Sequence, residues 1–260
     1  MMAGQAVFAG RIVRGLVVGA WSVEIGIATP APGESLSSAA RRLAERVVAE
    51  VTGLPAAVVR VASLLPSGRP VVASDDGLLA ITVSIAHERG FVCAAVCAGA
   101  GIGIDVVDTS AARAGLDYWL DDAERSAASP GMIWAAKEAA YKAAGLDAVF
   151  RPLGVAVEPS DDGTFAWTLR DDWRSVSGRG RFLEVGCHLV AVACTDSPQC
   201  PSADRSEQGG RRHVSERHPP SAIAPRVGVH RSGVVCPREA IGAHSRMAHG
   251  CHHGRNTESR

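Results

Sequence analysis

The sequence predicts a mixed fold in which helices and strands alternate in two runs, about 7–98 and 99–196. Each run holds one long helix with recognisable end signals, and each holds apolar strands separated by short turns. Apolar residues make up 47% of the chain, which is enough to bury such elements around a sizeable core.

The first run begins with strands. Residues 7–30 are rich in Val, Ile and Gly, which indicates one or two strands. Residues 35–53 predict a helix, because Ser residues can cap its start and Gly53 can end it. Residues 66–77 predict a loop rich in Pro, Gly and Asp, and residues 79–98 predict two paired strands.

The second run begins with a strand at 102–107 and continues with a helix at 116–128. Ser129 and Pro130 open the next helix as cap and first helical residue, and Gly145 ends it. Further strands are predicted near 153–158, 164–169 and 182–194.

Residues 197–260 differ in composition from the rest. They contain no Leu, Phe, Trp, Tyr or Lys, and seven of the nine His lie there. Such a segment buries too little apolar surface to offset its ordering entropy, so we expect a disordered tail. Cys251, His252 and His253 could bind zinc, but no second pair lies at zinc-finger spacing, and incidental composition is the favoured interpretation.

The composition also excludes several classes of protein. No apolar stretch has the length of a membrane span or the layout of a signal peptide, so we expect a cytoplasmic location with reduced thiols. The formal net charge is zero, and we find no basic stripe typical of nucleic-acid binding. We expect a monomer with no membrane or nucleic-acid partner.

Lysine is rare in this chain, with 25 Arg against only Lys137 and Lys142. On the helix from 130, Trp134, Glu138 and Lys142 share one face. On spacing alone, an ordinary surface ion pair between Glu138 and Lys142 is the favoured interpretation. A phosphate or metal site is the alternative.

Asp105 lies in a strand that is otherwise apolar, Gly-Ile-Gly-Ile-Asp-Val-Val. Asp is depleted in strands and is seldom buried without a partner. It could cap a strand end or pair with Arg. It could also join Glu138 as a ligand of magnesium, which prefers one or two carboxylates, waters and phosphate oxygens.

Upstream motifs add further cations. His87 lies in Ser-Ile-Ala-His, and Arg69 lies in the loop Ser-Gly-Arg-Pro. Both side chains can donate hydrogen bonds to phosphate. A His at a turn is nevertheless more often a plain surface residue.

The ordered set SGRP, SIAH, GIGID and WAAKEAAYK resembles the two-lobed 4'-phosphopantetheinyl transferases of the surfactin-synthetase-activating (Sfp-like) type. The resemblance spans roughly residues 35–195. It implies an α+β fold of two pseudo-symmetric lobes, 1–98 and 99–196. Each lobe would pack a small antiparallel sheet on a long helix, with the active site in the cleft between them and the metal site on the second lobe.

The resemblance also implies an activity. Such enzymes transfer 4'-phosphopantetheine from coenzyme A to a serine of an apo acyl or peptidyl carrier protein, and they release adenosine 3',5'-bisphosphate. The cofactor would be Mg2+, the partners coenzyme A and a carrier protein, and the setting by analogy secondary metabolism.

Site residues follow by position. Asp105 and Glu138 would bind magnesium, Lys142 would contact the pyrophosphate, and Glu138 would receive the serine proton, directly or through a water. Lys137 would be a neighbouring phosphate or structural contact. The remaining coenzyme A phosphates would be held by Arg41, Arg69 and His87, with Arg42 and Arg46 as competitors for the place of Arg41.

The chain departs from the family pattern at two positions. Val107 stands where many relatives carry a third metal-binding Glu, and Asp108 would point to the other strand face unless a bulge intervenes. Ala86 stands where relatives often have Ser. Two alternatives therefore stay open: a non-catalytic relative that binds carrier protein or coenzyme A, and a different magnesium-dependent phosphate enzyme.

Overall fold

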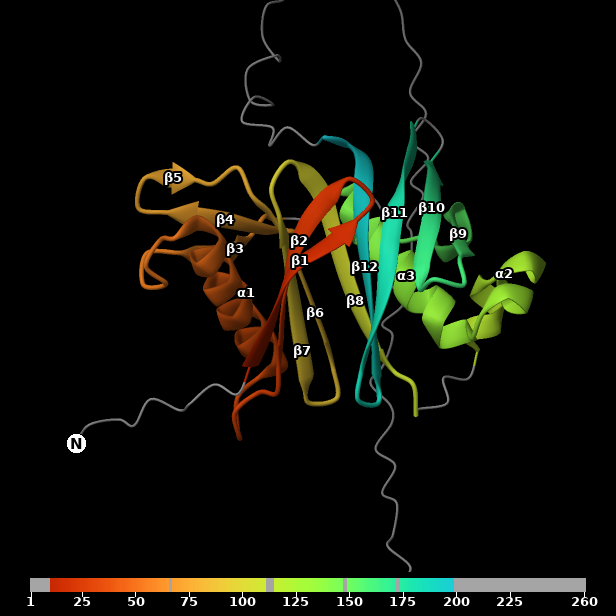
Figure 1. Ribbon diagram of the computed structural model, residues 1–260, viewed down its shortest axis with the longest axis horizontal. Coiled ribbons are helices and arrows are strands. Elements are labelled where there is room, and N and C mark those ends of the chain that lie inside the picture. The colour runs from red at the N-terminus through yellow and green to blue at the C-terminus, as the bar shows by residue number, and fades with distance from the viewer. Residues whose placement is uncertain (1–9, 66, 111–114, 147–148, 172–173, 199–260) are drawn as a thin grey trace, which may run out of the picture. The chain divides into compact units, whose positions relative to one another are not determined.

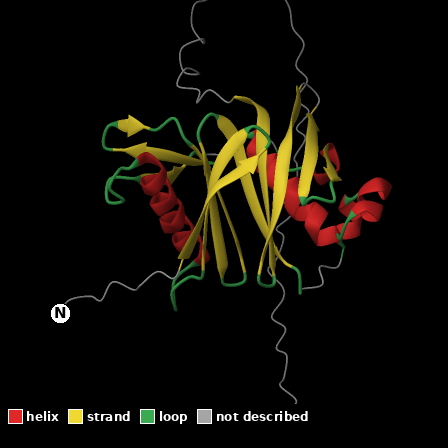
Figure 2. Cartoon of the chain, in the orientation of Figure 1, coloured by secondary structure: helices red, strands yellow, loops and turns green. Residues whose placement is uncertain are grey.

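Antiparallel strands account for most of the structure, a computed structural model that describes residues 10–65, 67–110, 115–146, 149–171 and 174–198 (Figure 1). Within these residues the strands form three sheets, and few helices accompany them (Figure 2). The fold class is therefore α+β, as the resemblance implies. The predicted disorder of 197–260 concerns a segment that, apart from its first two residues, lies outside the described residues.

Two larger sheets and one small sheet are built as follows. The first sheet has the order β1 (Gly10–Val18), β2 (Trp21–Ala28), β7 (Phe91–Cys97), β6 (Thr82–Glu88). The second has the order β8 (Ala100–Asp108), β12 (His188–Pro198), β11 (Arg174–Val185), β10 (Thr164–Asp171), β9 (Val155–Pro159). The small sheet has the order β3 (Arg60–Ser63), β4 (Pro70–Ser74), β5 (Gly77–Leu78).

The helices of the described residues are two long ones and several short ones. They are α1 (Leu36–Thr52), α2 (Asp122–Ala127), α3 (Pro130–Ala144) and the short 3-10 helices η1 (Leu116–Trp119) and η2 (Pro152–Gly154). The caps of α1 and α3 are those that the sequence predicts. The Ser35 and Ser129 hydroxyls each accept a backbone N–H three residues on, and Gly53 and Gly145 end the helices with positive φ.

Each long helix covers one sheet. Helix α1 lies beside the first sheet and α3 beside the second (Figure 1). Apolar residues of α1 pack against β2, β6 and β7, and those of α3 pack against β8 to β12. The opposite faces of the two larger sheets share a third apolar cluster, which contains Ile25 and Cys93 from the first sheet and Ile104 and Val192 from the second. The site-bearing strand β8 thus lies between two cores.

Three elements of the structure differ in detail from those that the sequence predicts. The predicted loop 66–77 contains β4, which starts at Pro70, a position that strands tolerate. The predicted strand near 182–194 is a hairpin, because Gly186 adopts a φ of 61° in a two-residue turn. The predicted helix 116–128 breaks at Asp121, whose side chain caps α2 by accepting the N–H of Glu124.

No helix in the described part of the chain combines the length and apolar character that a membrane crossing requires. The expected boundary between residues 98 and 99 falls in the bend between β7 and β8.

Candidate functional site

The candidate site forms where α3 crosses β8 at Gly103. A Cβ atom at this position would lie 1.8 Å from the carbonyl oxygen of Ala139 and 2.6 Å from the amide nitrogen of Ala143. Only Gly permits this approach, and the small Ala side chains on the buried face of α3 permit it from the other side. The helix backbone therefore lies directly on the strand, two residues before Asp105.

This crossing brings together the three residues expected to carry the chemistry. The Lys142 ammonium donates to Asp105 Oδ1 at 2.8 Å and to the carbonyl oxygen of Ile104 at 3.0 Å. Glu138 Oε2 lies 3.7 Å from the same nitrogen. The side chain of Asp105 is 11% exposed, whereas Glu138 and Lys142 are about one-third exposed, at 30% and 31%. The cluster therefore has a buried wall and an open side.

The electrostatics of the cluster favour a cation. Burial raises the pKa of Asp105 to about 7, although the nearby Lys142 ammonium opposes the rise; the charge of Glu138 and its hydrogen bond to Asp105 add to it. Burial disfavours the charged form of Lys142, but the two carboxylates outweigh it and raise the Lys142 pKa. Two carboxylates in hydrogen-bonding contact thus share one positive charge, and either would gain from a second cation.

The donor set fits magnesium with two protein carboxylates. A hard cation of this size takes one or two carboxylates and fills its other positions with water and phosphate oxygens. No group of three or more His, Cys, Asp and Glu side chains suited to a metal occurs among the described residues. The set therefore offers Asp105 and Glu138, with no third carboxylate beside them.

The residues after Asp105 explain why a third carboxylate is missing. Val107 is buried on the same strand face as Asp105 and joins the core under α3. Asp108 belongs to the opposite face, and it accepts hydrogen bonds from the backbone and hydroxyl of Ser110. The pairing of β8 with β12 has no bulge between Asp105 and Asp108, so Asp108 does not turn toward the site.

The site lies at the edge where β8 meets β6. The backbone N–H of Ile104 donates to the buried Ser84 hydroxyl at 3.1 Å, and the Thr82 hydroxyl donates to the carbonyl oxygens of Cys97 and Ala100. These two hydroxyls join the first sheet to the edge of the second. The sequence motifs assign no role to Ser84 or Thr82, although a hydroxyl in a buried, largely apolar strand is a signal for one.

Two expected phosphate ligands have exposed side chains. His87 lies on β6, three residues beyond Ser84, and Arg41 lies on α1. Neither side chain makes a hydrogen bond or ion pair within the described part of the chain. By contrast, Arg42 pairs with Glu34 at 2.6 Å and Arg46 pairs with Glu50 at 3.4 Å, so Arg41 is the freest of the three candidates on this helix.

Arg69 is already engaged. It is half-buried, and its guanidinium donates to the carbonyl oxygen of Gly145 at 2.7 Å. Gly145 is the residue that ends α3, so Arg69 contacts the helix that carries Glu138 and Lys142.

Lys137 is a structural residue. Its side chain is 2% exposed and pairs with the equally buried Glu124 at 2.8 Å. Its ammonium also donates to the carbonyl oxygens of Pro152 and Val155 at 3.0 and 2.6 Å. With these partners all three donors are used, which leaves no N–H of Lys137 to hold a cofactor phosphate. Its other expected role, a structural contact, is the one observed.

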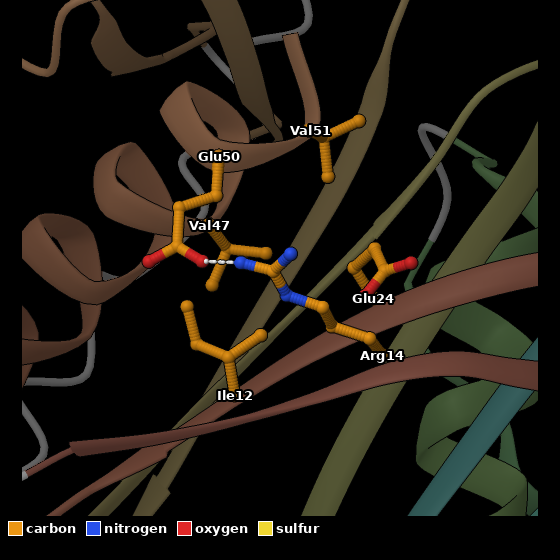
Figure 3. A pocket seen from close by; sticks show the side chains of 6 residues that line it. All are labelled: Ile12, Arg14, Glu24, Val47, Glu50 and Val51. Atoms are coloured by element: carbon orange, nitrogen blue, oxygen red, sulfur yellow. Dashed lines mark hydrogen bonds and ion pairs between the residues drawn. The ribbon is translucent and has the colours of Figure 1, made fainter. Parts of the chain in front are cut away.

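A hollow of about 220 Å³ lies between the β1–β2 hairpin and α1 (Figure 3). Arg14 reaches across it to Glu50 at 2.6 Å, and Glu24 faces it from β2. None of the residues expected to bind coenzyme A or metal lines this hollow, so it is separate from the candidate site.

Comparison with known proteins does not assign the chain to a family. A scan against models of protein families finds no match to this chain, and a search of curated proteins finds no significant relative. The candidate site therefore rests on its own geometry and on the ordered motifs.

Proposed function

We propose that the protein is a 4'-phosphopantetheinyl transferase that modifies a serine of a carrier protein with coenzyme A as donor. One observation carries the proposal: the Lys142 ammonium lies between Asp105 and Glu138, at 2.8 and 3.7 Å, on β8 beside the edge where it meets β6. The motifs GIGID and WAAKEAAYK are far apart in the sequence, yet they meet there. A surface ion pair of Glu138 and Lys142 alone does not explain the buried Asp105.

We also propose that the fold consists of two similar lobes. In each half, the strand that comes before the long helix pairs with the last strand of that half: β2 with β7, and β8 with β12. Each half also packs that long helix on its own sheet. This repeated connectivity supports a pseudo-symmetric pair of lobes, with the candidate site beside their junction.

Asp105 and Glu138 are the residues that would hold Mg2+. A bound ion would replace part of the contact that these carboxylates make with Lys142. When bound, the ion would neutralise charge on the pyrophosphate oxygens of coenzyme A. Val107 leaves this a two-carboxylate site completed by water. The two carboxylates suit such an ion because their negative charges repel each other, and a bound cation would offset that repulsion.

Lys142 would act on the phosphate that reacts. Its ammonium is held in place by Asp105 and by the carbonyl oxygen of Ile104, so it needs little reorganisation to meet developing negative charge. Glu138 is the more exposed carboxylate of the pair and is our candidate to accept the proton of the carrier serine. The serine oxygen bonds to the β-phosphorus, and the bond to the bisphosphate leaving group breaks.

His87 and Arg41 are the candidates for the remaining phosphates of coenzyme A. Both are exposed, and neither side chain is engaged elsewhere within the described residues.

Incubation with coenzyme A, Mg2+ and an apo carrier protein, followed by intact-mass measurement of the carrier, tests the proposal. We expect the carrier to gain the mass of one phosphopantetheine group, and Glu138→Gln to abolish most of the gain. Turnover of Glu138→Gln close to that of the wild type at saturating Mg2+ would remove the proposed role of Glu138.

One observation favours a second function. Val107 fills the place of a third carboxylate with buried apolar surface, which suits a relative that binds coenzyme A or a carrier without transfer. Such a protein would leave every one of several carriers unmodified in the intact-mass assay. Phosphate release without carrier modification would point instead to another magnesium-dependent phosphate enzyme.

A further inference from the structure

Arg69 lies at a junction that the proposed chemistry does not use directly. It follows a tight loop and precedes β4, and its guanidinium reaches the C-terminal end of α3, 76 residues further along the chain. The contact is a 2.7 Å hydrogen bond to the carbonyl oxygen of Gly145. The expected phosphate ligand is therefore bonded to protein.

The backbone of Arg69 is held firmly. Its carbonyl oxygen accepts the N–H of Leu64 at 2.8 Å, and the N–H of Gly68 donates to the Leu64 carbonyl oxygen at 2.6 Å. The N–H of Arg69 itself donates to the Ser67 hydroxyl at 3.4 Å. Because Pro70 then begins β4 of the small sheet, the backbone that carries the Arg69 side chain is held on both sides.

The end of α3 is shaped to receive this guanidinium. Gly145 has a φ of 63°, and a Cβ atom there would lie 2.6 Å from a guanidinium nitrogen of Arg69. The last carbonyl groups of a helix carry partial negative charge and lack partners within the helix, so a cation is favourable there. Both the backbone conformation and the packing of Arg69 require Gly at this position.

The same helix turn carries the catalytic lysine. The N–H of Gly145 donates to the carbonyl oxygen of Lys142 at 3.2 Å, and the Lys142 ammonium contacts Asp105 and the Ile104 carbonyl. A shift of this last turn would move the ammonium away from those partners. A displacement of about 1 Å in a catalytic group can reduce the rate by orders of magnitude.

We infer that Arg69 is a positioning residue, which fixes the last turn of α3 and with it Lys142, rather than a ligand of coenzyme A. The inference rests on the proposed function for its kinetic consequences. The resemblance gives Arg41 and Arg69 the same role, whereas we assign them different ones. Arg41 would bind a phosphate, and Arg69 would act through Lys142.

Matched glutamine variants test the difference. For Arg69→Gln we expect amide hydrogen exchange across 141–145 to accelerate about tenfold and kcat to fall about tenfold, with KM for coenzyme A within about twofold. For Arg41→Gln we expect KM for coenzyme A to rise about tenfold with helix exchange unchanged. Arg60→Gln, whose guanidinium contacts only its neighbour Val59 among the described residues, should change neither.

Arg69→Lys covers the case in which Arg69→Gln does not fold. Lysine is a competent phosphate ligand but lacks the planar fork of arginine, so at least half of the kcat loss should remain. Full recovery by Lys, or an Arg69→Gln variant that raises KM for coenzyme A while kcat and exchange stay unchanged, would overturn the inference. If the wild type modifies no carrier, the proposed function fails, and the exchange measurement still decides whether Arg69 holds the helix end.

Discussion

Replacement of Lys137 by Met removes the positive charge from a buried ion pair while keeping an unbranched side chain of similar length. Glu124 would keep the N–H groups of Asp121 and Val157 as donors but would lose the ammonium at 2.8 Å. Removal of one partner from a buried pair typically costs about 3–5 kcal/mol, since the remaining charge is left uncompensated. The side chains are 2% and 3% exposed, so water cannot replace the lost partner.

For a domain of this size that loss lowers the melting temperature by about 10 °C. Thermal and urea unfolding of Lys137→Met measure it, and the double variant Glu124→Gln with Lys137→Met is the control. Without the buried charge, we expect the double variant to be at least about 1 kcal/mol more stable than Lys137→Met. Affinity of the folded single variant for coenzyme A should stay within about twofold. A loss of stability below about 1 kcal/mol, or a large fall in affinity at unchanged stability, would refute a structural role for Lys137.

Three further predictions concern the strand that carries the site. Gly103→Ala should destabilise the protein by about 3 kcal/mol or more in urea unfolding, because its Cβ would meet the α3 backbone, whereas Gly131→Ala on the same helix should be neutral or stabilising. Ser84→Ala should cost about 1–3 kcal/mol by leaving the Ile104 N–H without a partner, and a loss under about 0.5 kcal/mol would contradict the bridging role. Burial raises the pKa of Asp105 to about 7, above its value of roughly 4 in an unfolded chain. The folded metal-free protein then holds a proton that the unfolded chain has lost, so stability falls as pH rises between these values. We therefore expect the free energy of unfolding of Asp105→Asn to rise by up to about 4 kcal/mol relative to that of the wild type between pH 4 and pH 8. If the two proteins show the same dependence of unfolding free energy on pH, the raised pKa of Asp105 is contradicted.

Local sequence signals predict the helices of this chain well. Ser35, Ser129, Gly53 and Gly145 each act through their own backbone neighbourhood, so the ends of α1 and α3 can be read from a few adjacent residues. The helix at 116–128 was predicted as one element. Its break at Asp121 is a local signal, since Asp121 and Glu124 form a capping box three residues apart. The buried ion pair of Glu124 with Lys137 and its bond to the Val157 N–H depend on distant residues, which a local pattern does not contain.

The site was only partly predictable for the same reason. Glu138 and Lys142 are four residues apart, and helical spacing alone places them together. Their meeting with Asp105 depends on Gly103, whose missing side chain lets the helix touch the strand. Motif order could bring the three into one hypothesis, but it left Lys137 as either a phosphate or a structural contact. Burial favours the structural contact, because the Lys137 ammonium is enclosed by Glu124 and two carbonyl groups, whereas the Lys142 side chain is 31% exposed.

The decisive experiment is an intact-mass measurement of an apo carrier protein incubated with this protein, coenzyme A and Mg2+. We expect the carrier to gain one phosphopantetheine group with the wild type and with Arg60→Gln. We expect little or no gain with Lys142→Met, or when chelator removes the metal. An unmodified panel of carriers with folded wild-type protein, or full modification by Lys142→Met, would contradict the proposed function.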